Sequence, residues 1–319
     1  MKTPSKILIT GGAGFIGSHL VESLLAKGNE VICIDNFLTG KKENIEEFLG
    51  RKNFRLFKYD IIQPLKKEIR QKIHGITRLY HLASPASPPQ YKKYAIETLL
   101  VNSIGTYNML EVAKEERAKF LLASTSEVYG NPLVHPQKEG YFGNVNPIGV
   151  RSCYDEGKRF AESITMNYHR KYQVDTRIIR IFNTYGPKMD REDGRVIANF
   201  INQALRDIPL TMHGDGTQTR SFCYVSDMVD GLSRAMESKG ANSEVINLGY
   251  PKEYTISEIG KIIVDLTKSS SEIKRYPPQE DDPERRKPDI TKAKKLLGWD
   301  PSVSLTIGLS HTINYFRSL

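Results

Sequence analysis

Two side chains in the middle of the sequence, Tyr154 and Lys158, have the types and the spacing needed for acid–base chemistry. Residues four apart lie on one face of a helix, so we expect the phenol and the ammonium group to be neighbours. An ammonium charge stabilises a phenolate, and we therefore expect Lys158 to lower the pKa of Tyr154 toward working pH. Such a tyrosine can take the proton of a hydroxyl group while a hydride leaves the same carbon. The pair alone is common by chance and gains weight only from its sequence context.

A glycine-rich turn near the N-terminus supplies that context. It follows the apolar run Ile7–Thr10, opens a helical pattern, and places Gly11, Gly14 and Gly17 at the spacing of a dinucleotide-binding fingerprint. Glycine lets the backbone approach a pyrophosphate, and the N-terminus of the helix offers unpaired N–H groups to the same anion. Asp35, at the end of the next predicted strand, can bind a ribose 2′-hydroxyl and would repel a 2′-phosphate. The sequence therefore predicts NAD as the cofactor.

Two further strand ends could contact this cofactor. Asp60 follows the third predicted strand, and Leu82–Ser84 ends the fourth. In a doubly wound sheet the ligand lies outside the carboxyl ends of the strands, so these residues are placed for adenine and nicotinamide-ribose contacts. Each of them could equally do no more than cap its strand.

The elements that must position these residues alternate between strand and helix. Helical patterns cover the segment after Gly14, Leu99–Glu116 and Asp155–Tyr172. Such alternation predicts an α/β fold with a doubly wound (Rossmann) parallel sheet, buried on both faces. The predicted strands are short apolar runs: Ile7–Thr10, Glu30–Asp35, Phe54–Tyr59, Arg78–Leu82, Lys119–Ala123, Asp175–Ile181 and Glu244–Leu248.

The last third of the chain is less regular, with polar, glycine-bearing loops and a segment rich in charge and proline. We expect a smaller, mixed C-terminal lobe that binds the substrate. The expected division is an NAD-binding domain over residues 1–182, to which the chain returns at about 222–250. The smaller, substrate-binding lobe would comprise residues 183–221 and 251–319.

Composition excludes several classes of protein. The 319 residues are 39% hydrophobic and 26% charged, which is ordinary globular usage and not that of a disordered or fibrous chain. Three cysteines without a Cys/His cluster argue against a disulfide scaffold and a metal site. No apolar stretch approaches the ~20 residues of a membrane helix, and no hydrophobic signal core precedes Ile7, so we expect a cytoplasmic protein. The net charge of +9 is spread among acids, which does not favour nucleic-acid binding.

Taken together, the glycine turn and the Tyr154/Lys158 pair resemble the extended short-chain dehydrogenase/reductases, and among these the UDP-glucuronic acid decarboxylases. The resemblance spans nearly the whole chain. It rests on the motifs Asp35–Gly40, His81–Pro89, Ser124–Gly130, Asn146–Gly149, Cys153–Arg159, Arg180–Pro187, Asp193–Arg195, Gln218–Arg220 and Arg286–Asp289.

The resemblance implies that UDP-glucuronate is converted to UDP-xylose at a single site. The C4 hydroxyl is oxidised, with Tyr154 as base and Thr125 sharing the hydrogen bond. The 4-ketone then accepts electrons as the C5 carboxylate leaves as carbon dioxide. C5 is protonated, and the hydride returns from the cofactor to C4.

The resemblance also implies roles for residues outside the pair. Glu127 would handle protons and water near the sugar, Arg286 would face the substrate carboxylate or the developing oxyanion, and Ser126 would position the sugar. A structural ion pair and a solvated surface arginine are the alternative interpretations of Glu127 and Arg286. UDP contacts are implied for Asn183, Asn199 and Arg220, while Arg195 could face either cofactor or substrate. The implied cofactor contacts are Gly11, Gly14, Phe15, Ile16, Asp35, Asn36, Phe37, Thr39, Gly40, Asp60, Ile61, Leu82, Ala83, Ser84, Asn102, Tyr154 and Lys158.

Related activities remain as alternatives. Nucleotide-sugar 4,6-dehydratases carry an aspartate where Ser126 stands, and a serine is too weak an acid to replace it at neutral pH. A 4-epimerase usually lacks the carboxylate of Glu127 as well. A protein that binds NAD without catalysis is a third interpretation, and it predicts that Tyr154→Phe has no effect.

One segment departs from the family pattern. Residues 98–102 read Thr-Leu-Leu-Val-Asn, with Leu100 where the family usually has a lysine. If that lysine meets an anionic substrate, this chain lacks a charge there. The helices over Leu99–Glu116 and Asp155–Tyr172 also resemble the pair that builds a four-helix bundle in the family's homodimer.

Overall fold

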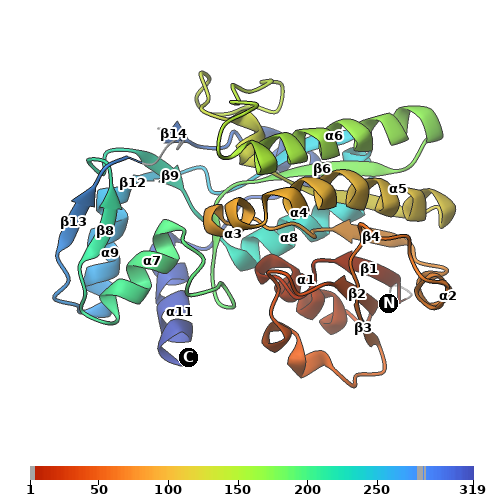
Figure 1. Ribbon diagram of the computed structural model, residues 1–319, viewed down its shortest axis with the longest axis horizontal. Helices are drawn as coiled ribbons and strands as arrows, with labels where there is room; N and C mark the ends of the chain where they lie inside the picture. The colour runs from red at the N-terminus through yellow and green to blue at the C-terminus, as the bar shows by residue number, and fades with distance from the viewer. Residues whose placement is uncertain (1–3, 279–282, 284) are drawn as a thin grey trace.

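A seven-stranded, all-parallel sheet forms the centre of a computed structural model that describes residues 4–278, 283 and 285–319 (Figure 1). The strand order is β11-β6-β5-β4-β1-β2-β3. From β1 the chain adds β2 and β3 on one side and then returns to add β4 and the later strands on the other side, so the strand order switches between β1 and β4. All seven predicted strands are confirmed, and with them the doubly wound fold class. Their bounds are β1 Lys6–Thr10, β2 Glu30–Asp35, β3 Phe54–Lys58, β4 Arg78–His81, β5 Lys119–Thr125, β6 Thr176–Ile181 and β11 Glu244–Leu248.

Helices cover both faces of this sheet, which explains why its strands are apolar on both sides. One buried cluster packs α1 (Phe15–Ala26), α8 (Val225–Glu237) and α10 (Thr291–Leu297) against the strands. A second cluster, on the opposite face, contains apolar side chains of α2 (Lys67–Ile73), α5 (Thr106–Glu115) and α6 (Ser152–Tyr172). Strands β1 and β2 alternate between the clusters, since Ile7 and Ile9 belong to the first and Leu8 to the second.

The helical segment expected over Leu99–Glu116 starts earlier and is interrupted. After α3 (Pro88–Lys93), α4 runs over Ala95–Leu100 and is followed by a π-helical turn, Val101–Gly105, before α5 begins. Side chains within this turn bond to backbone carbonyls four residues earlier, from Asn102 Nδ2 to Thr98 O (2.8 Å) and from Ser103 Oγ to Leu99 O (2.7 Å). These side-chain bonds accompany the wider π-helical turn.

The smaller lobe lies to the left of the sheet in Figure 1 and combines short mixed sheets with three helices. In it, β9 pairs antiparallel with β12 and parallel with β14, while β8 pairs parallel with β13. A third buried cluster joins the helices of this lobe to β8. Their bounds are α7 Val196–Ala204, β8 Leu210–His213, β9 Thr219–Ser221, β12 Glu253–Thr255, α9 Ile256–Thr267, β13 Ile273–Tyr276, β14 Arg285–Arg286 and α11 Leu305–Arg317.

Two short strands, β7 (Thr184–Tyr185) and β10 (Cys223–Tyr224), pair with each other where the chain passes between the sheet and the smaller lobe. Residues 1–3, in the segment expected to bind NAD, lie outside the described part of the chain, as do residues 279–282 and 284 in the segment expected to bind the nucleotide sugar. Within the described part, none of the helices combines the length and the apolar character needed to cross a membrane.

Candidate active site

The glycine-rich turn between β1 and α1 is built so that a ligand can lie against backbone. Gly11 has a φ of 76°, and a Cβ there would stand 2.7 Å from the backbone nitrogen of Ala83, so only glycine fits. Helix α1 begins at Phe15 without a side-chain hydrogen bond capping its N-terminus at Gly14. The first N–H groups of the helix therefore remain for an anion, as a dinucleotide pyrophosphate requires.

Beyond the turn, Asp35 ends β2 with its carboxylate oriented by the backbone. It accepts hydrogen bonds from Ala13 N (2.9 Å) and Phe37 N (2.8 Å), and burial raises its pKa. Asn36 Nδ2 donates to Asp60 Oδ2 at 3.0 Å, so the ends of β2 and β3 are held together. These carboxylates line a small cavity of about 80 Å³, which suits the adenosine end of a dinucleotide.

A larger cavity of about 340 Å³ opens from the same turn and extends to the smaller lobe. The two cavities share Gly11, Gly14, Thr39, Leu82 and Ser84 in their walls. Every predicted catalytic and substrate-binding residue lines the larger one: Thr125, Ser126, Glu127, Tyr154, Lys158, Asn183, Arg195, Asn199, Arg220 and Arg286.

Two of the predicted cofactor contacts lie elsewhere. Phe37 packs against the hydrophobic cluster on the α1 face, and neither cavity wall includes it. Asn102 is fully buried behind the wall, where its amide donates to Ser84 Oγ at 2.9 Å. Asn102 therefore orients a lining residue in this structure and does not itself face the cavity.

Tyr154 and Lys158 lie one turn apart near the start of α6, as their spacing predicts, and both are buried. The ammonium nitrogen lies 5.9 Å from the centre of the tyrosine ring and donates to Ala123 O at the end of β5 (2.9 Å). Burial raises the pKa of Tyr154 to about 12, although a hydrogen bond with Thr125 acts to lower it. Burial lowers the pKa of Lys158 to about 7.

The expectation that Lys158 lowers the pKa of Tyr154 is therefore wrong for the protein by itself. Burial disfavours the charged form of each group. It therefore raises the pKa of Tyr154 away from neutral pH and lowers the pKa of Lys158 toward neutral pH. The spacing in the sequence gives the proximity of the two groups, but not the depth at which they are buried.

A carboxylate on the wall of the same cavity, only 13% exposed, stands between two arginines. Glu127 follows β5 in a short 3-10 turn, Ser126–Tyr129, and forms ion pairs with Arg286 and with Arg151 (2.5 Å). Burial acts to raise the pKa of Glu127, but the two guanidinium groups outweigh it and hold this pKa at about 2. Glu127 is thus an ionised, fully paired carboxylate, and Arg286 is buried rather than solvated.

Sequence reasoning missed two residues of this site. Arg151 pairs with Glu127, and Tyr91 stacks on Tyr154 with ring centres 5.0 Å apart and planes within 2°. Both residues line the larger cavity. The position of Arg151, directly before the helix that carries Tyr154, was the available signal; Tyr91 had none, since the stack joins distant segments.

Leu100, the departure from the family pattern, is partly buried at the end of α4. It is absent from the walls of both cavities, although its neighbour Val101 lines the smaller one. Leu100 itself therefore contacts neither the cofactor pocket nor the substrate pocket in this structure.

Comparisons with known proteins agree with this geometry. The family model described as GDP-mannose 4,6 dehydratase matches residues 8–312. UDP-glucuronic acid decarboxylase 5 of Arabidopsis thaliana is 55% identical over 313 residues, which cover 98% of this chain and 89% of that protein. UDP-glucuronic acid decarboxylase 1 of Xenopus tropicalis is 53% identical over 316 residues, which cover 99% of this chain and 73% of that protein.

Solved structures give the same result at the level of the fold. The UDP-glucuronic acid 4-epimerase of Bacillus cereus, in complex with UDP-glucuronic acid and NAD, superposes with a TM-score of 0.89 at 31% identity, covering 98% of this chain and 99% of that one. The UDP-glucose 4-epimerase of Thermotoga maritima superposes with a TM-score of 0.89 at 32% identity, covering 98% of this chain and 99% of that one. The chain therefore belongs to the extended short-chain dehydrogenase/reductase family, in the branch of the UDP-glucuronic acid decarboxylases.

Proposed function

We propose that this protein is an NAD-dependent enzyme that decarboxylates UDP-glucuronate to UDP-xylose. The observation that carries the proposal is the joint placement of two groups in one cavity of about 340 Å³. The Tyr154/Lys158 pair suits oxidation of a hydroxyl, and the buried Glu127–Arg286 ion pair suits a substrate that carries a carboxylate. The relatives that are more than half identical are named for this activity.

The walls of the two cavities fit NAD. The N-terminus of α1 at Gly14 would bind the pyrophosphate, and Asp35 would bind the adenosine ribose. Bound NAD would supply a reversible hydride acceptor next to C4 of the sugar. Tyr154 lies on the wall of the larger cavity, where its phenol can face that hydroxyl.

This chain's own residues then perform the proton transfers. Tyr154 takes the proton of the C4 hydroxyl and later returns it, and Thr125 shares the hydrogen bond. When the C5 carboxylate leaves as carbon dioxide, the bonding electrons pass to the 4-ketone and form an enolate. Arg286 holds the charge of the carboxylate and of this enolate, because a guanidinium stays ionised even when buried. A proton then adds to C5, beside Glu127.

A 4,6-dehydratase or a 4-epimerase is the second candidate, since solved structures with this fold include both. Ser126 is buried on the cavity wall and offers no carboxyl group to protonate a C6 hydroxyl. That absence favours decarboxylation over dehydration.

The test is to supply purified protein with NAD and UDP-glucuronate and to follow carbon dioxide and the nucleotide sugar together. We expect equal amounts of carbon dioxide and UDP-pentose, and loss of both in Tyr154→Phe. Parallel incubations with UDP-glucose and dTDP-glucose test the alternatives. Turnover of either, with UDP-glucuronate inert, would reject the proposed reaction.

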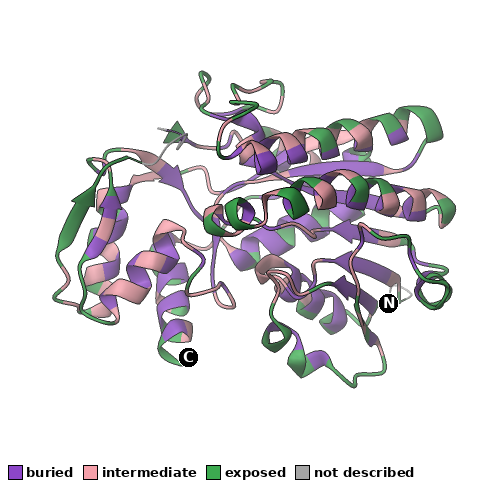
Figure 2. Ribbon diagram, viewed as in Figure 1, coloured by how far each residue is buried: buried purple, intermediate pink, exposed green. Residues whose placement is uncertain are grey.

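The proposed assembly is a homodimer through a four-helix bundle. Large apolar side chains are exposed along α4, the π-helical turn, α5 and α6, at Ile96, Leu99, Ile104, Tyr107, Phe160 and Tyr172. Figure 2 shows exposed stretches of ribbon along these helices. The contacts between α4 and α6 and between α5 and α6 make these helices one layer. A second copy of the same layer would cover this face, as self-complementary dimer interfaces do.

The proposed division into domains follows the sheet. Residues 1–182 with 222–250 would bind NAD, and residues 183–221 with 251–319 would bind the nucleotide sugar. It is supported by the pairing of β11 with β6 and by the separate buried cluster of the smaller lobe, whereas α10, within 251–319, packs against the sheet. We place the enzyme in the cytoplasm, because its three cysteines, Cys33, Cys153 and Cys223, are buried and unpaired, as a reducing compartment allows.

A further inference from the structure

Arg286 reaches the cavity from a strand that has little support of its own. Strand β14 comprises only Arg285 and Arg286, and it pairs with β9 alone. The guanidinium nevertheless takes one defined position, where Nη2 donates to Gly130 O at 3.0 Å and Nη1 pairs with Glu127. Further contacts must hold the backbone next to Arg286, since a long side chain loses about 2 kcal/mol of rotamer entropy when it is fixed.

Gln137 makes those contacts. It is fully buried and hydrogen-bonds to the residue that follows Arg286 through main chain and side chain together. Gln137 N donates to Lys287 O (2.8 Å), and Gln137 Oε1 accepts from Lys287 N (2.8 Å). Gln137 O also accepts from Asp289 N (2.8 Å), while Nε2 donates to Val134 O (2.8 Å). Gln137 thus hydrogen-bonds to the backbone N–H and C=O groups that follow β14 and fixes this segment to the 130–142 loop.

Asn247, at the end region of β11, joins this contact to the other member of the ion pair. Its Nδ2 donates to Gln137 O (3.0 Å), and its Oδ1 accepts from Tyr129 Oη (2.8 Å). Tyr129 belongs to the same 3-10 turn as Glu127. Asn247 therefore links the turn that carries Glu127 to Gln137, the residue that holds the backbone after Arg286.

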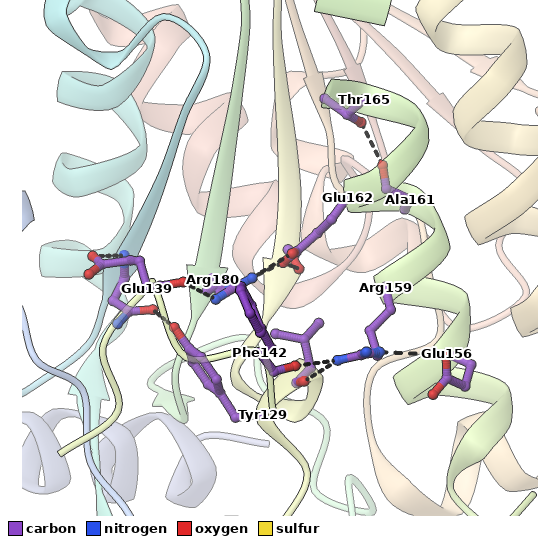
Figure 3. A network of polar contacts seen from close by, with 12 residues as sticks. Tyr129, Glu139, Phe142, Glu156, Arg159, Ala161, Glu162, Thr165 and Arg180 are labelled. Carbon is purple, nitrogen blue, oxygen red and sulfur yellow. Dashed lines mark hydrogen bonds and ion pairs between the residues drawn. The ribbon is translucent and has the colours of Figure 1, made fainter. Parts of the chain in front are cut away.

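The loop that carries Gln137 is also attached to the helix that carries Tyr154. Arg180 of β6 donates from Nη1 to Glu139 O (3.1 Å) and from Nη2 to Glu162 Oε2 of α6 (2.7 Å), as Figure 3 shows. Glu139 Oε1 in turn accepts from Asn247 N at 2.9 Å. The loop is thus tied to β6, β11 and α6, which surround the site.

We propose that Gln137 is a positioning residue that places the Arg286 guanidinium against Glu127 and the substrate carboxylate. This inference rests on the proposed function for its effect on turnover, but the placement itself can be measured without turnover. Gln137 lies outside both cavity walls, so it acts only through the backbone that it holds.

The first test is a double-mutant cycle with Gln137→Met, which keeps the length of the side chain and removes its two side-chain hydrogen bonds, to Lys287 N and Val134 O. Because a misplacement of about 1 Å can cost roughly 100-fold in rate, we expect kcat for UDP-glucuronate to fall 10- to 100-fold. In an Arg286→Ala background the same substitution should change kcat by less than about twofold, since the group that it positions is gone. An equal loss in both backgrounds would overturn the proposal.

The matched control is Asn29→Leu. Asn29 likewise holds backbone by its side-chain amide, accepting from Ser5 N (3.1 Å) and donating to Leu24 O (3.0 Å), but it precedes β2 at the opposite end of the strands. We expect a lower thermal midpoint in both variants and a change in kcat only in Gln137→Met. If Gln137→Met does not fold, Gln137→Glu is the second variant, because it keeps the acceptor for Lys287 N. We expect its kcat to lie between those of the parent protein and Gln137→Met.

A second readout needs no turnover. The pKa of Glu127, about 2 in the intact site, can be followed by 13C NMR of labelled glutamate carboxyls, with Glu127→Gln assigning the signal. Gln137→Met should raise this pKa by about one unit or more, because Arg286 moves away from the carboxylate. An unchanged pKa would overturn the inference. Absence of UDP-glucuronate turnover in the parent protein would reject the proposed function alone.

Discussion

The ammonium group of Lys158 donates a 2.9 Å hydrogen bond to the carbonyl oxygen of Ala123. This contact fixes helix α6 to the end of β5, where the chain turns into Thr125 and Glu127. Burial lowers the pKa of Lys158 to about 7, so near neutral pH its charge is in balance with the neutral amine.

The first prediction concerns stability against pH. Between pH 7 and 10.5 the unfolded chain holds a proton on Lys158 that the folded chain releases. Its contribution to the free energy of unfolding therefore rises with pH across this window, by up to ~1.4 kcal/mol per unit, and becomes constant below pH 7. In Lys158→Met that slope should disappear. Urea unfolding at several pH values measures it, and parallel curves for the two proteins would contradict the assignment.

The second prediction concerns Glu127→Gln. This change keeps the size of the side chain but leaves Arg286 and Arg151 without their carboxylate. We expect kcat to fall roughly 100-fold, because the carboxylate that holds both guanidinium groups in place is gone and a small misplacement of such groups is costly. KM for UDP-glucuronate should not rise, because both guanidinium charges become available to the anionic substrate.

Glu156→Gln is the control for that experiment. Glu156 lies on the same helix as Tyr154 but is half-exposed and pairs only loosely with Arg159, at 3.5 Å. It should leave kcat and KM unchanged. A rise in KM for Glu127→Gln, with kcat intact, would show instead that Glu127 only binds the substrate.

The third prediction separates two glycines of the turn. Gly11→Ala forces a Cβ against the backbone of Ala83 at positive φ, so we expect ~1–3 kcal/mol less stability and no bound NAD. A Cβ at Gly14 would meet only Gly11 O, at 3.3 Å, so Gly14→Ala should fold normally. It should still bind NAD more weakly, because its methyl group enters both cavities. Thermal midpoints and NAD titrations check both variants.

The fourth prediction tests the proposed dimer. Ile104 is 45% exposed on the π-helical turn, and Ile104→Glu would place a charge in the expected interface. We expect this variant to sediment as a monomer. Ile307→Glu, at a 55% exposed position of α11 in the smaller lobe, should keep the mass of the parent protein in sedimentation equilibrium. A monomeric parent protein would end the proposal.

The fifth prediction restores the family's charge with Leu100→Lys. Because Leu100 is absent from both cavity walls, we expect kcat/KM for UDP-glucuronate to change by less than about twofold. An increase of tenfold or more would mean that the side chain reaches the substrate in the bound state.

The sequence by itself determined the features that depend on local patterns. Apolar runs bounded by turn residues located the seven strands, and the glycine spacing located the cofactor turn, because periodicity and backbone freedom are properties of neighbouring residues. The four-residue spacing likewise placed Tyr154 and Lys158 on one face of α6. The predicted cofactor contacts at the strand ends and in the turn line the cavities. The prediction departed from the structure at Phe37 and Asn102, whose side chains point into packing.

Only the tertiary structure decided the electrostatics of the site. The pKa values of Tyr154 and Lys158 follow from burial, which no spacing encodes. The Glu127–Arg286 ion pair joins residues 159 positions apart, and the Tyr91–Tyr154 stack joins α3 to α6. Such contacts arise when the fold brings distant segments together, and the low dielectric of the interior then sets which groups carry charge.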